Sequence, residues 1–286
     1  MNFREILKPI SPEMNLVTKE ITSQIHKIYE GNIANSPYWQ QMNRTVEYVF
    51  RVKGKMLRPA LVLLTGKAVK SSDELAEDPL IQMAGAVELI HSASLIHDDI
   101  IDDSEMRRNQ LSVNNKFGNH LAVLVGDILY SHFFSVVTSL TAVPNHQKIR
   151  LLDMFSRITK RMCMGEIYEE YFRSTSVEPS FDEYLFVIEN KTASLMSLCC
   201  FTGAILNRAD ESVLERMADF GLQLGLAFQL VDDYLDDDSV FKTKAVLLQK
   251  AEEFINAAED RIGFLKPSLN KECLLQIGKF ILKRAE

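Results

Sequence analysis

The sequence predicts an all-α protein, a single-domain bundle of about ten helices. Apolar residues recur at i, i+3, i+4 and i+7 along nearly the whole chain, which is the period of amphipathic helices. Gly and Pro number only 12 and 8 of 286 residues, too few for an all-β fold with many turns. Helix breakers fall between the periodic segments, at 35–37, 71–79, 144–146, 174–179, 207–210 and 267–271. No Gly/Ser-rich linker interrupts the chain, so we expect one domain over residues 1–286.

Composition excludes several classes of partner and environment. The net charge of −7 argues against nucleic-acid binding, because phosphate backbones require a basic surface. The four cysteines, Cys163, Cys199, Cys200 and Cys273, form no C-x-x-C pair, which indicates thiols of a reducing compartment. The first residues carry charges and prolines where a signal peptide needs an apolar run. We therefore expect a cytoplasmic protein.

No uninterrupted apolar segment reaches the roughly 18 residues typical of a transmembrane helix. The nearest candidates are residues 121–143 and 192–207, and polar residues interrupt both. We expect two helices that are buried on all sides. An apolar product could still bring the protein into transient contact with a membrane surface.

Two aspartate-rich clusters stand inside apolar, helix-periodic sequence. Each contains D-D-x-x-D: Asp98, Asp99 and Asp102 in the first, and Asp232, Asp233 and Asp236 in the second. Residues four apart share one face of a helix, so Asp98 and Asp102 point together, and so do Asp232 and Asp236. Two like charges about 5 Å apart repel by about 3 kcal/mol at an effective dielectric near 20. Such pairs in apolar surroundings require a compensating charge.

Magnesium is the simplest compensation for these carboxylates. Mg²⁺ commonly binds one or two carboxylates together with phosphate oxygens, so the pair of clusters predicts a Mg²⁺-mediated clamp on a diphosphate. The alternative for either cluster alone is a solvated helix end. Two such clusters, each following a long apolar helical run, favour the metal site.

Small residues lie beneath the first cluster. Val87, His91, Ser94, Asp98 and Asp102 fall within a narrow arc at 100° per residue, and Ala93 stands beside Ser94. The small side chains of Ala93 and Ser94 would leave a depression or tunnel below the metal site. Close helix–helix contact explains the same residues, and their size alone does not decide between the two.

Three basic groups complete a diphosphate site. Lys55 and Arg58 stand three apart in G-K-M-L-R-P, Arg107 and Arg108 follow the first acidic cluster, and Lys191-Thr192 precedes an apolar helix. Arginine offers a bidentate fork to phosphate oxygens and lysine a point charge. Each group alone would be read as solvated surface charge. Their occurrence beside two acidic motifs makes them binding candidates.

From about Asn43 to Asp238 the chain resembles the all-trans polyprenyl (isoprenyl) diphosphate synthases. The resemblance rests on G-K-x-x-R-P, E-L-I-H-S-A-S-L-I-H-D-D-I-I-D, R-R, G-D-I-L, K-T-A and F-Q-L-V-D-D-Y-L-D, in this order. The chain is most similar to the medium- and long-chain bacterial type, such as octaprenyl synthases. The resemblance implies mostly antiparallel helices around a deep central cavity, the isoprenoid synthase fold, and a homodimer.

The resemblance also assigns roles to individual residues. The six motif aspartates would face each other and hold Mg²⁺, with Asp98, Asp99, Asp102, Lys191, Asp232 and Asp233 as the catalytic set. Arg107, Lys191, Thr192 and Gln229 would contact the diphosphate of an allylic substrate such as geranyl or farnesyl diphosphate. The diphosphate of isopentenyl diphosphate would be bound by Lys55, Arg58, His91 and Arg108.

The implied reaction lengthens a prenyl chain by five carbons. Ionisation of the allylic diphosphate gives a cation, the double bond of isopentenyl diphosphate attacks it, and a proton is lost to the released diphosphate. In related enzymes, large side chains four or five positions before the first motif aspartate stop growth early. Those positions are Ser94 and Ala93, so we expect a medium or long product of the kind used as a quinone tail. A C15–C20 product remains the alternative if Phe133 or Phe134 sets a deeper floor.

The sequence departs from the family pattern at several places. Lys53, Asn109 and Glu169 stand where a Gly, a Gly and a Gln are usual. After Asp238 the family continues with a flexible segment carrying G-K-x-x-G-x-D, but this chain runs directly into its last predicted helices. If the protein lacks that segment, either Lys242 or Lys244 substitutes for its lysine or the active-site lid is missing. Otherwise the sequence omits a disordered loop.

Three functions remain open at this stage. An active prenyltransferase is favoured because all six motif aspartates are present. A non-catalytic subunit of a heteromeric prenyl synthase would be expected to lose such residues, and only the missing segment favours it. A terpene cyclase would not need the second diphosphate site at Lys55, Arg58, His91 and Arg108.

Overall fold

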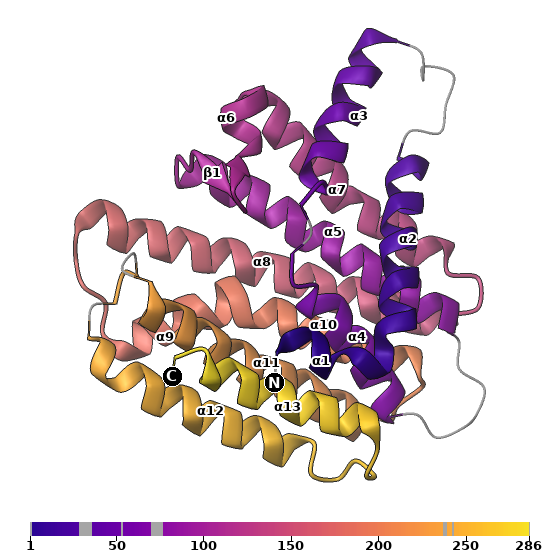
Figure 1. Cartoon of the computed structure of the whole chain (residues 1–286), viewed down its shortest axis with the longest axis vertical. Coiled ribbons are helices and arrows are strands. Elements are labelled where there is room, and N and C mark those ends of the chain that lie inside the picture. Colours follow the sequence, from indigo (N-terminus) through magenta and orange to yellow (C-terminus); the bar gives the residue numbers. More distant parts are fainter. Residues whose placement is uncertain are drawn as a thin grey trace. The chain divides into compact units, whose positions relative to one another are not determined.

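A computed structural model confirms the all-α prediction. It describes residues 2–28, 36–52, 54–69, 77–236, 239–241 and 243–285, without the side chains of residues 38 and 77. The absence of strands was predicted wrongly in one place, since Met106–Arg107 (β1) and Gln110–Leu111 (β2) pair as a two-residue antiparallel hairpin. The α-helices of the described residues (Figure 1) are α1 Phe3–Ile6, α2 Ser11–Lys27, α3 Pro37–Val49, α4 Leu57–Val69, α5 Glu77–Ile101, α6 Val113–Phe117, α7 Asn119–Ser139, α8 Asn145–Thr175, α9 Phe181–Ile188, α10 Ser194–Leu206, α11 Glu211–Leu235, α12 Leu247–Arg261 and α13 Leu269–Lys283.

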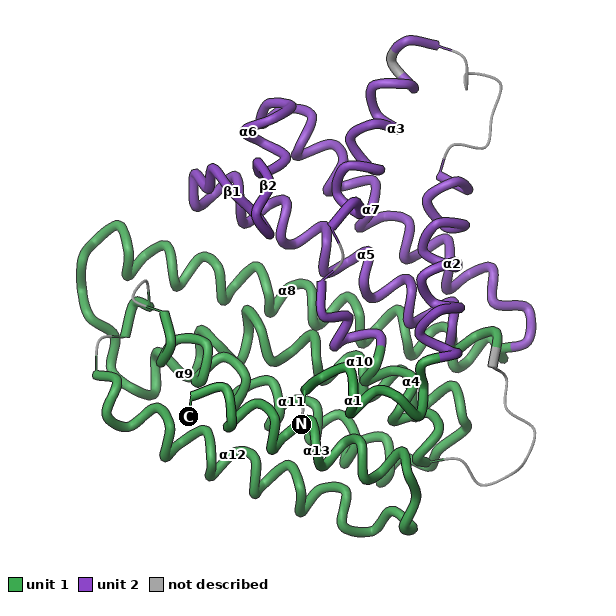
Figure 2. Tube along the Cα trace, in the orientation of Figure 1, with its two compact units in different colours: residues 1–11, 60–80, 143–286 green, residues 12–59, 81–142 purple. Residues whose placement is uncertain are grey.

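Contacts between residues divide the chain into two compact units (Figure 2). Unit 1 comprises residues 1–11, 60–80 and 143–286, and unit 2 comprises residues 12–59 and 81–142. The first acidic cluster lies in unit 2 and the second in unit 1. The single domain over residues 1–286 stays a prediction.

Unit 1 is organised around α10. Every residue from Ser194 to Leu206 is buried, as predicted for the segment 192–207. Helices α8 and α11 pack against α10, and α12 and α13 pack against α11. A helix that is apolar all round can be stable only where neighbours cover every face, which explains the central place of α10 in this unit.

A π-helical turn joins α9 to α10. Glu189–Ala193 adopts this conformation, which is uncommon and is found frequently at functional sites. The turn contains Lys191 and Thr192 and packs against both α8 and α11. Gly225 of α11 makes this approach possible, because a Cβ atom there would stand 2.5 Å from the Cα of Ala193.

Unit 2 contains α2, α3, α6, α7 and most of α5. Helices α5 and α7 pack closely, and the His97 Nε2 atom of α5 lies 3.2 Å from the Val123 carbonyl oxygen of α7. Gln24 of α2 donates a hydrogen bond of 2.9 Å to the carbonyl of Gln82 in α5. These contacts hold α5, which carries the first acidic cluster, between two other helices of the unit.

Helices α5 and α7 are long and apolar enough to cross a membrane by length and composition, which is weak evidence for a span. The apolar window of Asp78–Ile101 is 78% buried inside the protein, as in the core helix of a globular fold, whereas that of Asn119–Ser139 is 39% buried. The prediction that residues 121–143 are buried on all sides was therefore wrong. Val123, Leu124 and Phe134 are exposed, because unit 2 covers only one side of α7.

Replacing Gly225 by Ala should destabilise unit 1 and displace the π-helical turn. The new Cβ meets backbone atoms, which cannot move aside as a flexible side chain would, so we expect a loss of about 2 kcal/mol or more in the free energy of unfolding. Gly263→Ala is the matched control, because Gly263 is exposed and its Cβ would approach nothing closer than 3.3 Å. Urea denaturation measures both. Equal stability of the two variants would contradict the packing described for Gly225.

Candidate active site

The first acidic cluster lies at the C-terminal end of α5. The Asp102 amide donates a hydrogen bond of 2.8 Å to the Asp98 carbonyl, so helical geometry continues to Asp102 and places both residues on one turn. Asp98 is half-buried and Asp102 exposed, whereas Asp99 is 2% exposed. The three carboxylates therefore occupy different environments on one helix end.

Asp99 is held by an arginine from the following hairpin. The Arg107 Nε donates to Asp99 Oδ1 at 2.8 Å, and the Arg107 Nη2 makes a second, shorter contact with the same oxygen. Burial raises the pKa of Asp99, and the Arg107 hydrogen bonds and charge oppose that rise. Arg107 was predicted to contact a diphosphate, and in the ligand-free protein its partner is the buried carboxylate.

The hairpin turn explains one departure from the family pattern. Arg108 and Asn109 connect β1 to β2 with φ values of 52° and 61°. Two-residue hairpin loops favour turns in which both central residues have positive φ, and Asn is one of the residues that adopts this conformation readily. Asn109 thus fulfils the conformational role of the usual Gly. Positive φ is unfavourable for a larger residue such as Arg108. Residues with strained backbone of this kind are frequent at functional sites.

Three arginines surround His91. The Arg58 Nη1 lies 3.0 Å from His91 Nε2, and the Arg108 Nη1 donates to the Val52 carbonyl at 3.2 Å. Burial lowers the pKa of His91 well below its usual range, and the charges of Arg58, Arg108 and Arg107 lower it further. His91 is therefore neutral, and its Nε2 accepts from Arg58. Unit 2 thus contains Arg58, His91 and Arg108 in one basic cluster. Their role in binding a diphosphate stays a prediction.

The loop before α4 completes this basic cluster. Gly54 leaves the space that the Arg108 guanidinium fills, because a Cβ at Gly54 would stand 2.6 Å from Arg108 Nη2. Lys55, the other basic residue of this loop, has an exposed side chain. Lys53, the unusual residue before Gly54, lies outside the described residues.

Glu88 is a buried carboxyl group that sequence reasoning missed. It is 3% exposed, one turn before His91 on α5. Burial raises its pKa to about 7, although the charges of Arg58 and Arg108 lower it. The spacing of Glu88 three residues before His91 is the only signal that could have placed it in the cluster.

The second acidic cluster lies at the C-terminal end of α11. Asp232 forms an ion pair of 2.5 Å with Arg284, which follows α13. Asp233 accepts hydrogen bonds from Tyr184 at 2.5 Å and from Gln229 at 2.8 Å. Burial raises the pKa of Asp233, and these two donors oppose the rise. Asp236 follows α11, and its amide donates to the Asp232 carbonyl at 2.9 Å.

Lys191 and Thr192 reach the same part of unit 1 from the π-helical turn. Thr192 Oγ1 donates to Gln229 Oε1 at 2.9 Å, so Thr192, Gln229 and Asp233 form a hydrogen-bonded chain. Lys191 Nζ lies 2.7 Å from Glu166 Oε2 and forms a shorter ion pair with Glu169. Burial disfavours the charge on Lys191, but Glu169 and Glu166 raise its pKa above the usual range.

Tyr184, Glu166 and Arg284 were also missed by sequence reasoning. Arg284 stands 52 positions after its partner Asp232 in the numbering, so no local pattern connects the two. Tyr184 is 1% exposed and stacks on Phe241, with ring centroids 4.9 Å apart. Phe241 belongs to the short segment that follows the second acidic cluster in this chain. Of the candidate substitute lysines there, Lys242 lies outside the described residues and Lys244 begins a short 3-10 turn, Lys244–Val246.

The predicted chain-length residues lie in the middle of α5. Ala93 is buried, and Ser94 is half-buried with its hydroxyl donating to the His91 carbonyl at 3.0 Å. On α7, Phe133 is buried and Phe134 is exposed. Their effect on product length stays a prediction.

The acidic residues fit a hard divalent cation. Asp98 with Asp102, and Asp232 with Asp236, each offer carboxylate oxygens from one helical turn, the donor type that Mg²⁺ prefers. Among the described residues, no three His, Cys, Asp or Glu side chains converge into a ready-made metal centre.

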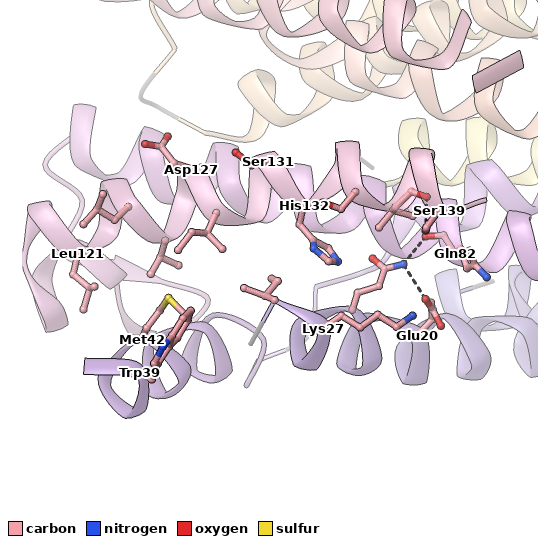
Figure 3. Close-up of a pocket in the computed structure, with 17 residues that line it drawn as sticks. Glu20, Lys27, Trp39, Met42, Gln82, Leu121, Asp127, Ser131, His132 and Ser139 are labelled. Carbon is pink, nitrogen blue, oxygen red and sulfur yellow. Dashed lines mark hydrogen bonds between the residues drawn. The ribbon is translucent and has the colours of Figure 1, made fainter. Parts of the chain in front are cut away.

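A separate cavity of about 730 Å³ lies in unit 2 and is open to solvent (Figure 3). Its walls come from α2, α3 and α7, with Gln82 from α5, and Lys27, Trp39 and His132 are among the lining residues. None of the predicted site residues lines it. The cavity is therefore distinct from the basic cluster at His91.

Comparison with known proteins agrees with the motifs. The family model described as polyprenyl synthetase matches residues 39–247. The chain is 36% identical over 240 residues to a decaprenyl-diphosphate synthase of Dictyostelium discoideum, covering 81% of this chain and 49% of that protein. It is 32% identical over 236 residues to an octaprenyl diphosphate synthase of Haemophilus influenzae, covering 82% and 65%. The chain thus spans about half to two thirds of the length of these relatives.

Solved structures show the same fold. The geranylgeranyl pyrophosphate synthetase of Pyrococcus horikoshii superposes with a TM-score of 0.86 at 23% identity, covering 99% of both chains. A decaprenyl diphosphate synthase of Rhodobacter capsulatus gives 0.81 at 21% identity, covering 100% of both. These likenesses confirm the predicted isoprenoid synthase fold.

The buried carboxyl group of Glu88 should make stability fall with pH. The folded state raises its pKa from 4.5 to about 7, so between these values the folded protein binds a proton that the unfolded chain has lost. Stability is therefore fullest below about pH 4.5 and falls by about 3 kcal/mol as pH rises through 7. Glu88→Gln should be more stable than the wild type by about that amount at pH 8 and nearly equal to it at pH 5. Urea unfolding at both pH values measures this, and parallel pH dependence in the two proteins would contradict it.

Proposed function

The chain belongs to the polyprenyl synthetase family, and from this we propose that it is a trans-polyprenyl diphosphate synthase. It would condense isopentenyl diphosphate head-to-tail onto an allylic diphosphate such as geranyl or farnesyl diphosphate. The cluster of Arg58, His91 and Arg108 carries this proposal, because it gives unit 2 an anion site beside the first acidic motif. A terpene cyclase, which takes a single diphosphate substrate, would not need that site.

In the proposed reaction, each diphosphate has its own set of donors. Arg58 and Arg108, with Lys55 and neutral His91, hold the diphosphate of isopentenyl diphosphate. Lys191, Thr192, Gln229 and Arg107 contact the allylic diphosphate. The carboxylates of the two D-D-x-x-D motifs would hold Mg²⁺. The bound Mg²⁺ would neutralise the charge on the leaving diphosphate. Arg107 and Lys191 must exchange their carboxylate partners, Asp99 and Glu169, for phosphate oxygens.

The chemical steps need no protein nucleophile. The carbon–oxygen bond of the allylic diphosphate breaks, and its electron pair leaves on the diphosphate. The double bond of isopentenyl diphosphate attacks the resulting allylic cation and forms the new carbon–carbon bond. A proton then leaves the condensed cation for the released diphosphate, which restores a double bond. The side chains that donate hydrogen bonds to the diphosphate orient it both as the leaving group and as the proton acceptor.

The assembly and setting are part of the proposal. A homodimer would cover the exposed apolar side chains of α7, Val123, Leu124 and Phe134, and sedimentation equilibrium would then give about twice the chain mass of 32.6 kDa.

We place the protein in the cytoplasm, with transient membrane contact for release of a long product, which suits a quinone side chain. The second candidate, a non-catalytic subunit of a heteromeric synthase, is favoured only by the short segment after the second acidic cluster.

The purified protein should incorporate labelled isopentenyl diphosphate into farnesyl diphosphate when Mg²⁺ is present. Asp98→Asn should lower the rate by about 100-fold or more, because it removes a proposed cation ligand and leaves the side-chain volume unchanged. Asp103→Asn is the matched control. Asp103 is an exposed neighbour with φ 48°, a conformation that Asn also adopts, so this variant should stay active. Wild-type protein that incorporates no label would refute the stand-alone enzyme.

Enlarging Ala93 or Ser94 should shorten the product. A phenylalanine at either position would project from the turn below Asp98 and fill the space that a growing chain would enter. We expect the wild type to yield products beyond C20, and Ser94→Phe to stop at C15–C20 while consuming isopentenyl diphosphate. Chromatographic sizing of the products measures this. Identical product lengths from both proteins would place the floor elsewhere.

A further inference from the structure

Lys191 is ion-paired with two carboxylates at once. Its Nζ lies 2.7 Å from Glu166 Oε2 and contacts Glu169 Oε2 still more closely. Glu166 and Glu169 stand one turn apart on α8, and all three side chains are less than a quarter exposed. The three groups together carry one net negative charge, and Arg173, whose Nη2 lies 3.7 Å from Glu169 Oε1, is a further cation beside them. The charge of Lys191 is therefore already matched by carboxylates in this structure.

The charge of Glu169 also reaches the second acidic cluster. Burial is the main cause of the raised pKa of Asp233 and of Tyr184, the donor that holds Asp233, and the charge of Glu169 raises both further. Asp232, in the same surroundings, is paired with Arg284. The charge of Glu169 thus acts both on the lysine that should receive the diphosphate and on the carboxylate that should receive the cation.

The effect of Glu169 can be isolated by comparison with glutamine, its neutral counterpart of similar size. Glutamine would accept the same hydrogen bond from Lys191 without adding a charge. The difference between the two residues is therefore electrostatic and not steric. Glutamate leaves the surroundings of Lys191 and Asp233 one unit more negative than glutamine would.

We propose that Glu169 is a positioning residue that makes this site bind a divalent cation before it binds diphosphate. The inference rests on the proposed function, in which Asp232 and Asp233 receive the cation and Lys191 the diphosphate. Before the cation arrives, the surplus negative charge repels a diphosphate and occupies Lys191. The same charge attracts the cation. Once the cation is bound, it offsets that charge, and Lys191 can exchange Glu169 for a phosphate oxygen.

Removing the charge should shift the two affinities in opposite directions. In the absence of metal, Glu169→Gln should lower the Kd for inorganic diphosphate by about fivefold, because partly exposed charges at this range interact with modest energy. In the absence of diphosphate, it should raise the Kd for Mn²⁺ by about fivefold. A variant that merely loosened the site would weaken the binding of both ligands.

The test uses the full chain and two separate titrations. Diphosphate binding is measured by calorimetry in excess chelator, and Mn²⁺ binding by the electron paramagnetic resonance signal of the free ion. Glu170→Gln is the matched control. Glu170 is the next residue on α8, is about half exposed, and has its nearest cation, Arg173, at 4.0 Å. It should change each Kd by less than about twofold. If Glu169→Gln does not fold, Glu166→Gln replaces it, because Glu166 contributes the same charge to Lys191.

The outcomes separate this inference from the proposed function. Opposite shifts in the variant and near-constant values in the control support cation-first binding. Wild-type protein that binds both ligands, with a variant in which neither Kd changes or both rise, overturns the role of Glu169 and leaves the proposed function standing. Wild-type protein that binds neither ligand alone overturns cation-first binding, and the proposed function falls only if Mn²⁺ and diphosphate added together also fail to bind.

Discussion

The structure depends on how carboxylates are compensated at the ends of two apolar helices. A buried, unpaired carboxylate is costly, and each acidic cluster solves the problem with charged or hydrogen-bonding partners, some near in the sequence and some distant. Asp99 pairs with Arg107, Asp232 with Arg284, and Asp233 accepts from Tyr184 and Gln229. The protein's own side chains thus place positive charge and hydrogen-bond donors on these carboxylates. In the proposed reaction, ligand binding would exchange these partners for Mg²⁺ and phosphate oxygens.

Each unit contains both acidic and basic groups of the proposed site. Unit 2 sets the arginines around His91 close to the first acidic cluster, with buried Glu88 among them. Unit 1 sets Lys191 and its two glutamates close to the second cluster. Glu169 is paired with the basic group of its unit, whereas Glu88 is buried within range of the charges of Arg58 and Arg108.

Much of the fold and site could be predicted from the sequence, because the signals were local. Helical periodicity predicted the all-α class, and the D-D-x-x-D spacing correctly placed each acidic cluster at a helix, with its last aspartate just beyond the end of α5 or α11. Local backbone conformation was harder to predict from the sequence. The π-helical turn at Lys191 leaves no mark that distinguishes it from an ordinary helix, and the short hairpin at Arg108 is too small to show strand alternation. Asn109, seen as a departure from the family, is explained only by its positive φ.

Residues that act through distant contacts escaped prediction for a different reason. Tyr184 and Arg284 look like ordinary core and surface residues in the sequence, and only the fold brings them to Asp233 and Asp232. The burial of Glu88 and the exposed face of α7 also depend on which helices pack together. Periodicity shows that a helix has an apolar side, but not whether the chain itself covers all of it.

The central claim of the proposed function is that the acidic clusters bind divalent cations that hold a diphosphate. The most direct measurement is a crystal structure of the protein with Mg²⁺ and an unreactive allylic diphosphate analogue. The expected result is Mg²⁺ bound by Asp98 and Asp102 and by Asp232, with Arg107 and Lys191 moved from their carboxylates onto phosphate oxygens. A diphosphate bound elsewhere, or cations on one cluster alone with Lys191 still paired to Glu166 and Glu169, would contradict it.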